Sequence, residues 1–438
     1  MSSLSRIPSL QFSRRDALRG ILGGGLLAAG SSAFPLRAAS PNAKAKSVIQ
    51  IWMWGGPSHT DTLDPKPEAG YDYCGPFTKP IATKTDGLQL NELLPLMAQQ
   101  SDKYSVIRSM THGIFAHETA SYAVQTGRKA GDRIVYPCAG AVVSLFKGEA
   151  TAGSLIPPYV VLTQPQGRFS ENGFLGEKYR PFATGGDPAQ PRFAVEGVVA
   201  PGVSDQRQLD RRDLLRKLNT LDHAMQDDSL IQTLDHAEQK AYELILGDAG
   251  KVFDLAQEKD EMRDRYGRNT FGQSCLAARR LVERGVPYVT INYQGWDTHR
   301  QNFQTMRQKL PQMDKGLATL LADLSERGLL DSTIVWWGGE FGRTPKVLWE
   351  APWNGGRNHW GDCFCALLAG GGFKGGRVVG ASDARGEQVR DRPVAPADLL
   401  GSIYTQLGID PDGKIPNNLG LDVKVTAGGA ASRLKEIL

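Results

Sequence analysis

The stretch VPYVTINYQGWDTHRQNFQTMRQKLPQMDKGLATLLADLSERGLLDSTIVWW, residues 286–337, holds the clearest secondary-structure pattern in the chain. Val286–Tyr293 is apolar and β-branched, which predicts a buried strand. Phe303–Arg327 has apolar residues at three- and four-residue spacing and stops before Gly328, which predicts a long amphipathic helix. Ser332–Trp337 predicts a second buried strand. Such a crossover makes the two strands parallel, so the loops that leave them emerge at one edge of a sheet.

Similar patterns on both sides of this stretch extend the prediction to an α/β fold with a largely parallel sheet. Strands and helices alternate along the chain, which is the order found in α/β proteins. Further strands are expected at Val48–Trp54, Ser105–Ile107, Tyr159–Thr163 and Phe364–Ala369, and further helices at Thr270–Glu283 and Pro396–Leu407. Residues 207–256 are polar with helical spacing, and they predict a helical insertion within the domain.

The N-terminus has the features of a twin-arginine signal peptide. Ser13–Leu18 has the sequence SRRDAL, and the apolar, glycine-rich run Gly20–Ala33 follows it. This run is shorter than the about 20 apolar residues of a spanning helix. The small residues Ala38-Ala39 suit signal-peptidase cleavage. We expect residues 1–39 to be removed after export to the periplasm or beyond, and residues 40–438 to form one α/β domain. The alternative is an ordinary amphipathic N-terminal arm.

The charge balance does not favour a nucleic acid or an anionic membrane as partner. The chain has 51 basic and 47 acidic residues, and the predicted signal holds five of the basic and one of the acidic residues. The mature chain therefore carries 46 of each, and no later stretch is long and apolar enough to span a bilayer. The five cysteines lack metal-type spacing, and their odd number leaves at least one without an intrachain partner. None of these patterns indicates an oligomeric state.

Carboxylates and histidines gather where the predicted strands end. The candidates are His59 and Asp61 after the first strand, Asp297 and His299 after Tyr293, Glu340 after Trp337, and His359 before Phe364. Open α/β sheets bind ligands at this edge, and imidazole with carboxylate suits zinc or a similar transition ion. The six residues predict a site for one or two divalent ions. Each pair alone could also be a capping Asp beside a surface His.

Five segments resemble a large family of twin-arginine-exported bacterial proteins of unknown function (DUF1501), within the alkaline-phosphatase-like and sulfatase superfamily. They are Trp52–Asp61 (WMWGGPSHTD), His117–Gly127, Gly295–His299 (GWDTH), Gly339–Pro345 (GEFGRTP) and Asn358–Trp360 (NHW). The resemblance covers nearly the whole mature chain. It implies a three-layer sandwich in which helices flank a largely parallel central sheet. It also implies a two-metal site that cleaves phosphate or sulfate esters through a hydroxyl or formylglycine nucleophile.

The resemblance assigns metal-binding roles residue by residue. Asp297 and His299 resemble an Asp-and-His pair that binds one metal, and His359 resembles the late histidine that completes that site. Glu340-Phe341 stands where relatives carry an Asp-His pair for the second metal, so one imidazole ligand is lost. Asp61 falls near the first-strand aspartate of the relatives.

The nucleophile is the point at which this sequence departs most from its relatives. The segment that begins at His117 resembles the nucleophile-bearing helix start, but His117 or Glu118 occupies the place of the serine. The hydroxyl candidates are Ser58, Thr119 and Ser121, with Ser58 and Thr119 ranked equally. No cysteine heads the pattern that formylglycine formation needs. Metal-dependent hydrolysis remains the main prediction, and a non-catalytic periplasmic binding protein with a partial metal site is the alternative.

Substrate contacts are predicted for an arginine and two tryptophans. Arg343 follows Glu340 by three residues, and its planar guanidinium would match phosphate or sulfate oxygens; the alternative is an ion pair with Glu340. Trp296 and Trp360 would form a stacking wall for a sugar, whereas core packing is the other role open to them. The expected substrate is a small-molecule or glycan ester.

Overall fold

The computed structural model describes residues 43–148, 155–164, 171–191, 193–195, 206–207, 210, 213–214, 250–417, 419–429 and 432–438. The fold below is that of the unit Ala38–Leu438. The predicted signal peptide lies outside the described residues, as does most of the insertion predicted at 207–256. Within the described ranges, no helix has the length and apolar character needed to cross a membrane.

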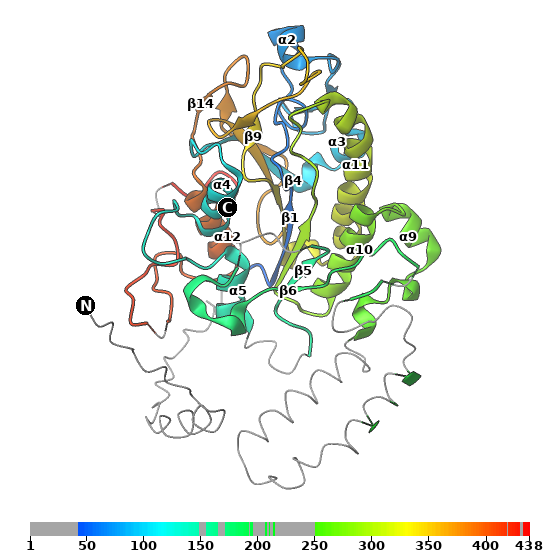
Figure 1. The fold of residues 1–438 in the computed structure, drawn as a ribbon, viewed down its shortest axis with the longest axis vertical. Helices are drawn as coiled ribbons and strands as arrows, with labels where there is room; N and C mark the ends of the chain where they lie inside the picture. The colour runs from blue at the N-terminus through cyan, green and yellow to red at the C-terminus, as the bar shows by residue number, and fades with distance from the viewer. Residues whose placement is uncertain are drawn as a thin grey trace, which may run out of the picture. The chain divides into compact units, whose positions relative to one another are not determined.

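An eight-stranded sheet lies at the centre of this unit (Figure 1). Its strand order is β12-β4-β11-β8-β1-β7-β5-β6. The strands are β1 (Ser47–Trp52), β4 (Tyr104–Met110), β5 (Tyr159–Leu162), β6 (Phe182–Ala183), β7 (Tyr288–Asn292), β8 (Thr333–Gly338), β11 (Phe364–Ala369) and β12 (Arg377–Val379). Three two-stranded sheets pair β2 (Ile81–Ala82) with β3 (Gln89–Leu90), β9 (Gly342–Arg343) with β10 (His359–Trp360), and β13 (Ala381–Ser382) with β14 (Val389–Asp391).

The direction of one strand, β11, decides where several loops meet. β1 lies between β7 and β8 and is parallel to both, with Ile49 opposite Val289 and Val335. β11 is antiparallel to its neighbours β4 and β8, whereas the other pairs in the large sheet are parallel. The prediction of a largely parallel sheet is confirmed. Because β11 is reversed, the loop before it lies at the edge where the loops after β1, β4, β7 and β8 emerge.

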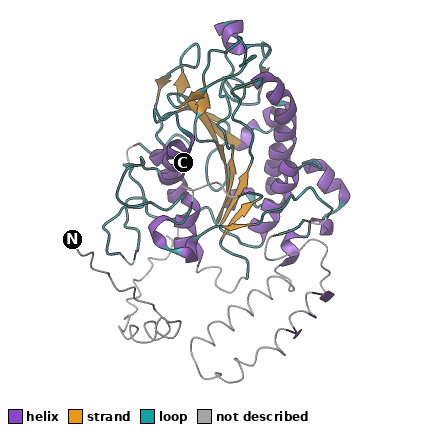
Figure 2. Ribbon diagram, in the orientation of Figure 1, coloured by secondary structure: helices purple, strands orange, loops and turns teal. Residues whose placement is uncertain are grey.

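Helices cover both faces of the sheet, so the fold has three layers (Figure 2). They are α2 (Tyr71–Cys74), α3 (Pro95–Gln99), α4 (His117–Thr126), α5 (Ala139–Lys147), α9 (Asp260–Tyr266), α10 (Thr270–Glu283), α11 (Asn302–Glu326) and α12 (Pro396–Gln406). In Figure 1, α9, α10 and α11 lie on one side of the strands and α4, α5 and α12 on the other. The alternation of side chains along a strand supplies an apolar surface to each helical layer.

Neighbouring residues on the strands show this alternation directly. Val160 and Val289 are fully buried in the apolar cluster that includes α10 and α11. Tyr159 and Tyr288 point to the opposite face, where their rings meet edge to face at 5.2 Å. Gly140 of α5 lies against the Tyr159 ring, because a Cβ there would come within 2.4 Å of it. The close approach of α5 to the sheet therefore depends on a residue without a side chain.

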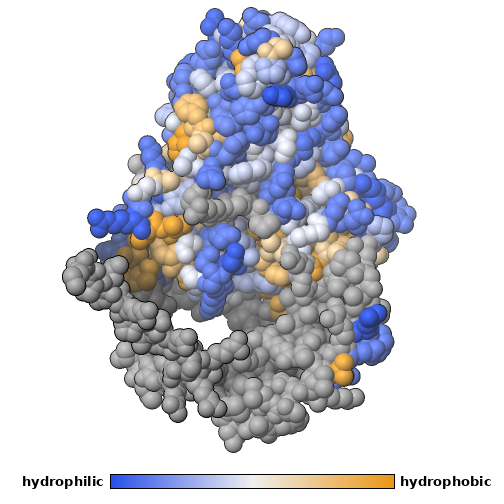
Figure 3. All heavy atoms as spheres, viewed as in Figure 1, coloured by the Kyte–Doolittle hydropathy of each residue, from blue (hydrophilic) through white to orange (hydrophobic). Residues whose placement is uncertain are grey.

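The elements predicted from sequence form within the described residues. The six predicted strands and three predicted helices are all present, with ends within three residues of the expected ones. Trp336 and Trp337 of β8 are each 1% exposed and belong to the core. On the face in Figure 3, the described surface is mainly hydrophilic, with apolar side chains in small groups.

Candidate metal centre

Segments from four places in the chain converge at one edge of the large sheet. The loop after β7 carries Asp297 and His299, and the loop after β8 carries Glu340. α4 begins at His117, a few residues after β4. His359 comes from the loop before β11, which reaches this edge because β11 is antiparallel. Neighbouring strands thus bring together side chains that are far apart in the sequence.

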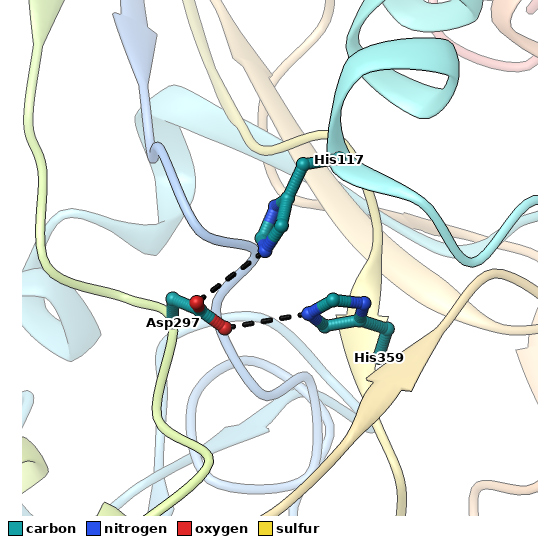
Figure 4. A group of neighbouring side chains, drawn as sticks. All are labelled: His117, Asp297 and His359. Atoms are coloured by element: carbon teal, nitrogen blue, oxygen red, sulfur yellow. Dashed lines mark hydrogen bonds and ion pairs between the residues drawn. The ribbon is translucent and has the colours of Figure 1, made fainter.

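Three histidine nitrogens lie close to the carboxylate of Asp297, and Figure 4 shows two of them, from His117 and His359. The Nε2 atom of His117 lies 3.4 Å from Oδ2, and the Nε2 atom of His359 lies 3.4 Å from Oδ1. His299 adds its own Nε2 at 3.2 Å from Oδ1. Ligand atoms of His117, Asp297 and His359 all lie within 4.8 Å of one another, a spacing that a metal ion can bridge.

The other ring nitrogen of each histidine contacts an acceptor. The Nδ1 atom of His359 lies 2.7 Å from the carbonyl oxygen of Phe115, and that of His299 lies 2.9 Å from Oδ1 of Asn358. The Nδ1 atom of His117 lies 2.6 Å from Oε1 of Glu340. Since these oxygens accept hydrogen bonds, each Nδ1 carries the proton in the neutral ring, and each Nε2 presents a lone pair.

The lone pairs converge so closely that a cation is the natural occupant. The Nε2 atoms of His299 and His359 are only 2.9 Å apart, and in this tautomer neither has a hydrogen to donate to the other. Two facing lone pairs repel, whereas a metal ion accepts both. Oriented Nδ1–H groups are the usual second shell of metal-binding histidines. The residues therefore fit a divalent ion held by three imidazoles and one carboxylate.

The charges around Asp297 keep it ionised. Burial alone would raise the pKa of its carboxyl, but hydrogen bonds from His117 and His359, when these rings carry a proton on Nε2 in the absence of a metal, and the guanidinium of Arg343 hold that pKa far below its usual range. Burial opposes protonation of His117, yet its hydrogen bonds to Asp297 and Glu340 raise its pKa to about 9. Without a metal, this protonated His117 offsets part of the negative charge of the two carboxylates.

Glu340 contributes to the centre by orienting its neighbours. The side chain is fully buried, and Oε1 accepts hydrogen bonds from the Gly55 backbone N–H at 2.9 Å and from His117 at 2.6 Å. We expected Glu340 as a ligand and His117 as a catalytic group. The geometry instead places His117 among the ligand atoms and Glu340 behind it. The loss of the nucleophile serine at His117 was the sequence signal that could have indicated this exchange.

Arg343 is a buried partner of Asp297 and presents no guanidinium to solvent. Its side chain is 0% exposed, and its NH2 group lies 2.5 Å from Oδ1 of Asp297. Its Nε donates to the Gly56 carbonyl at 3.0 Å, and its NH2 also donates to the Gly55 carbonyl. This burial corrects the prediction of direct anion binding. The alternative of an ion pair was the better one, although the partner is Asp297 and not Glu340.

The first-strand candidates Ser58, His59 and Asp61 lie in buried structural contacts. Both oxygens of Asp61 are held by Arg357, at 2.7 and 2.9 Å, and Oδ2 also accepts from Asn302. The Nε2 atom of His59 lies 2.8 Å from the Gly386 carbonyl, and burial lowers the pKa of this ring. We expected metal binding by His59 and Asp61. Neither belongs to the ligand group, by which we mean His117, Asp297 and His359 with His299 beside them. Arg357 neutralises the carboxylate of Asp61, and the Gly386 carbonyl occupies the Nε2 atom of His59.

The hydroxyl candidates form no contact with the ligand group among the described hydrogen bonds. Ser58 is fully buried and hydrogen-bonded to Thr60 at 3.2 Å. Thr119 donates to the Ala116 carbonyl within the first turn of α4, where Glu118 is exposed. Ser121 is 3% exposed. A role for these residues as nucleophile remains a prediction.

The aromatic residues near the centre are not all those expected. Trp296 is fully buried against Tyr293 and cannot stack on a substrate. Trp360 is half-buried, and its Nε1 donates to the Glu387 carbonyl at 2.8 Å. Trp54 and Trp353, which the sequence did not single out from other tryptophans, lie beside His117 at 5.5 Å and His299 at 6.3 Å between ring centroids.

A family model described as "Protein of unknown function (DUF1501)" matches residues 45–438. The chain belongs to this family. The match covers every residue of the ligand group and the whole central sheet. No curated protein matches the sequence.

Several solved structures resemble the fold at low sequence identity. The structure of Ps i-CgsB has 14% identity and a TM-score of 0.39, and the match covers 87% of this chain and 75% of that one. The lipoteichoic acid synthase LtaP from Listeria monocytogenes has 9% identity and a TM-score of 0.36, covering 87% and 74%. The alkaline phosphatase of the Antarctic bacterium TAB5 has 11% identity and a TM-score of 0.32, covering 78% and 96%.

Proposed function

We propose that this protein is an exported, metal-dependent hydrolase of phosphate or sulfate esters. The observation that carries the proposal is the convergence of Nε2 atoms from His117, His299 and His359 on Asp297, each with its Nδ1 atom against an acceptor. An arrangement that merely filled space would not need three prearranged tautomers. The motifs that resemble the alkaline-phosphatase-like superfamily support esters of phosphate or sulfate as the substrate class.

The donor set supports zinc or a similar transition ion as the cofactor. Three imidazole nitrogens and one carboxylate are borderline ligands, whereas magnesium and calcium prefer sites built from oxygen. When bound, such an ion polarises an ester oxygen and lowers the pKa of water. Other groups of the chain orient the ligands: Asn358, Glu340 and the Phe115 backbone carbonyl fix the histidines, and Arg343 forms an ion pair with Asp297.

Aromatic groups around the centre support a substrate that contains a ring, such as a sugar ester. Phe115 is 43% exposed and packs edge to face against Trp360 at 5.8 Å. Trp54 and Trp353 are partly exposed beside two of the histidines. Sugars and other rings stack on such faces. Export by the twin-arginine pathway would place this chemistry in the periplasm or outside the cell.

Metal analysis followed by an ester panel tests the proposal. The purified protein should contain zinc, iron or manganese, lose it to a chelator, and regain hydrolysis of phosphate or sulfate monoesters when the ion is restored. His359→Ala should lose both metal and activity. A wild-type protein that holds no transition metal after exposure to each ion would contradict the proposal.

A non-catalytic binding protein is the second candidate function. It is favoured by one observation: among the described residues, no serine or threonine hydroxyl contacts the ligand group. In that case the protein would bind a metal ion tightly and hydrolyse no ester on the panel. The same experiment therefore separates the two functions.

A further inference from the structure

The number of donor atoms at the centre limits how many ions it can hold. His117, His359 and Asp297 supply three ligand atoms within 4.8 Å of one another, and the Nε2 atom of His299 lies 3.2 Å from Oδ1 of Asp297 as a possible fourth. The other carboxylate at the centre is Glu340, whose Oε1 is used by His117 and Gly55. Its Oε2 is buried and has no hydrogen-bond partner among the described residues. A second ion would find a single free protein donor, while metal sites normally use three or four.

A permanent cation already lies beside these ligands. The guanidinium of Arg343 is fully buried, and its NH2 group is 2.5 Å from Oδ1 of Asp297, an atom that also faces His299 and His359. Carbonyls of Gly55, Gly56 and Arg357 accept its remaining hydrogen bonds, so the group is fixed in place. An arginine cannot lose its proton at ordinary pH. Its charge therefore acts on any ion bound by Asp297.

We infer that the centre binds one metal ion and that Arg343 supplies the second positive charge of the site. This inference rests on the proposed metal-dependent function. One divalent ion and Arg343 outweigh Asp297 and Glu340 by a single positive charge, which suits the binding of one anionic ester. A second divalent ion would add two more positive charges near a buried guanidinium, where water does little to screen their repulsion.

Metal stoichiometry of the wild-type chain tests the first half of the inference. Metal-free protein is titrated with zinc by calorimetry, and the zinc retained after gel filtration is measured by mass spectrometry. One ion per chain is expected. Two ions per chain would overturn the inference but leave the metal-dependent function intact. No retained ion would overturn both, so the two failures are distinguishable.

Charge-changing variants of Arg343 test the second half. Arg343→Gln removes repulsion toward the metal and attraction toward an anion. Zinc should therefore bind about tenfold more tightly, and inorganic phosphate should bind the zinc-loaded protein about tenfold more weakly. Arg343→Lys keeps the charge and should leave both affinities near the wild-type values. A residue that only positions Asp297 would give a different result, because both substitutions would weaken zinc binding.

Arg357 provides a matched control for these substitutions. It is also fully buried and paired with a carboxylate, but its partner is Asp61, which is outside the ligand group. Arg357→Lys should leave zinc and phosphate affinities unchanged. If Arg343→Gln does not fold, Arg343→Lys still decides the question: an unchanged zinc affinity supports the inference, and a zinc affinity reduced tenfold or more overturns it.

Discussion

At the scale of single residues, the proposed metal centre depends on partners that hold the histidine rings in one orientation. His299 is the simplest case, because its Nδ1 contacts the exposed side chain of Asn358 at 2.9 Å. That amide can be removed without opening the core. Glu340 and the Phe115 carbonyl perform the same role for His117 and His359, but one is fully buried and the other belongs to the backbone.

Asn358→Ala should weaken metal binding about 10-fold and leave the fold intact. The substitution removes the acceptor that fixes the tautomer and the ring orientation of His299, and losses of 10- to 100-fold follow the removal of such partners. Zinc affinity is measured by competition with a chromophoric chelator. Arg300→Ala, at an exposed position next to His299, is the control and should bind zinc as the wild type does. Equal affinities in both variants would show that Asn358 does not orient the ring.

At the scale of elements, the long helix α11 packs against both α10 and α3. Gly316 faces α10, and a Cβ at this position would lie 2.8 Å from the Phe271 ring. That ring is itself stacked on Tyr293, with centroids 4.3 Å apart, and has little room to move. The close crossing of α10 and α11 therefore requires a glycine in the middle of a helix.

Gly316→Ala should destabilise the protein by about 1–3 kcal/mol, the usual cost of overpacking a core. Helix propensity alone predicts the opposite, a gain of about 1 kcal/mol for replacing a mid-helix glycine with alanine. Chemical denaturation distinguishes the two signs. Ser325→Ala, at an exposed position of the same helix, serves as the reference and should change stability by less than about 0.5 kcal/mol.

The same helix also contacts α3 through Asp314, which is 3% exposed. Its oxygens accept the backbone N–H groups of Leu96 and Met97 at 2.9 and 2.7 Å. Burial nevertheless outweighs these hydrogen bonds and raises the pKa of Asp314 to about 6. The folded state thus retains this proton to a higher pH than the unfolded chain, in which an aspartate titrates near 3.9.

The stability that Asp314 contributes should therefore fall as the pH rises. It is fully present below about pH 4, falls by about 1.4 kcal/mol per pH unit up to about pH 6, and is constant above that. The difference in unfolding free energy between the wild type and Asp314→Asn should show this slope. Ser325→Ala, an exposed substitution in the same helix that changes no titratable group, should show no such slope. A difference that rises with pH would mean that the hydrogen bonds outweigh the burial.

At the scale of the whole molecule, packing and ion pairs hold the fold together without covalent cross-links. All five cysteines are free and buried. Burial raises the pKa of the Cys363 thiol to about 12 and that of Cys275 further still. Thiols with such pKa values react slowly, because the thiolate is the reactive form.

The native protein should therefore be nearly inert to a thiol reagent such as 5,5′-dithiobis(2-nitrobenzoic acid). Unfolding in denaturant should expose five reactive thiols per chain, with or without prior reduction, since the chain has five cysteines and all are free. The melting temperature should not change when a reducing agent is added. Fewer than five thiols in the unfolded, unreduced protein would reveal a disulfide and contradict the prediction.

The sequence by itself was sufficient to identify the principal elements and three of the four residues of the candidate metal centre. The strands and the helix between residues 286 and 337 have periodic patterns that depend only on neighbouring residues, and they form as predicted. Asp297, His299 and His359 could be found because polar residues beside strand ends at a sheet edge are a local signal. The family, too, was evident from short motifs, and the match over residues 45–438 establishes it.

Only the tertiary structure decided which side chains meet. His117 joins the ligand group because β4 lies beside the antiparallel β11, and no local pattern determines that strand order. Asp61 is excluded from the ligand group because Arg357, which lies 296 positions further along the chain, neutralises its carboxylate in the core. Trp296 turns inward to pack on Tyr293. Pairing between distant residues depends on packing and charge in three dimensions, which a one-dimensional pattern does not contain.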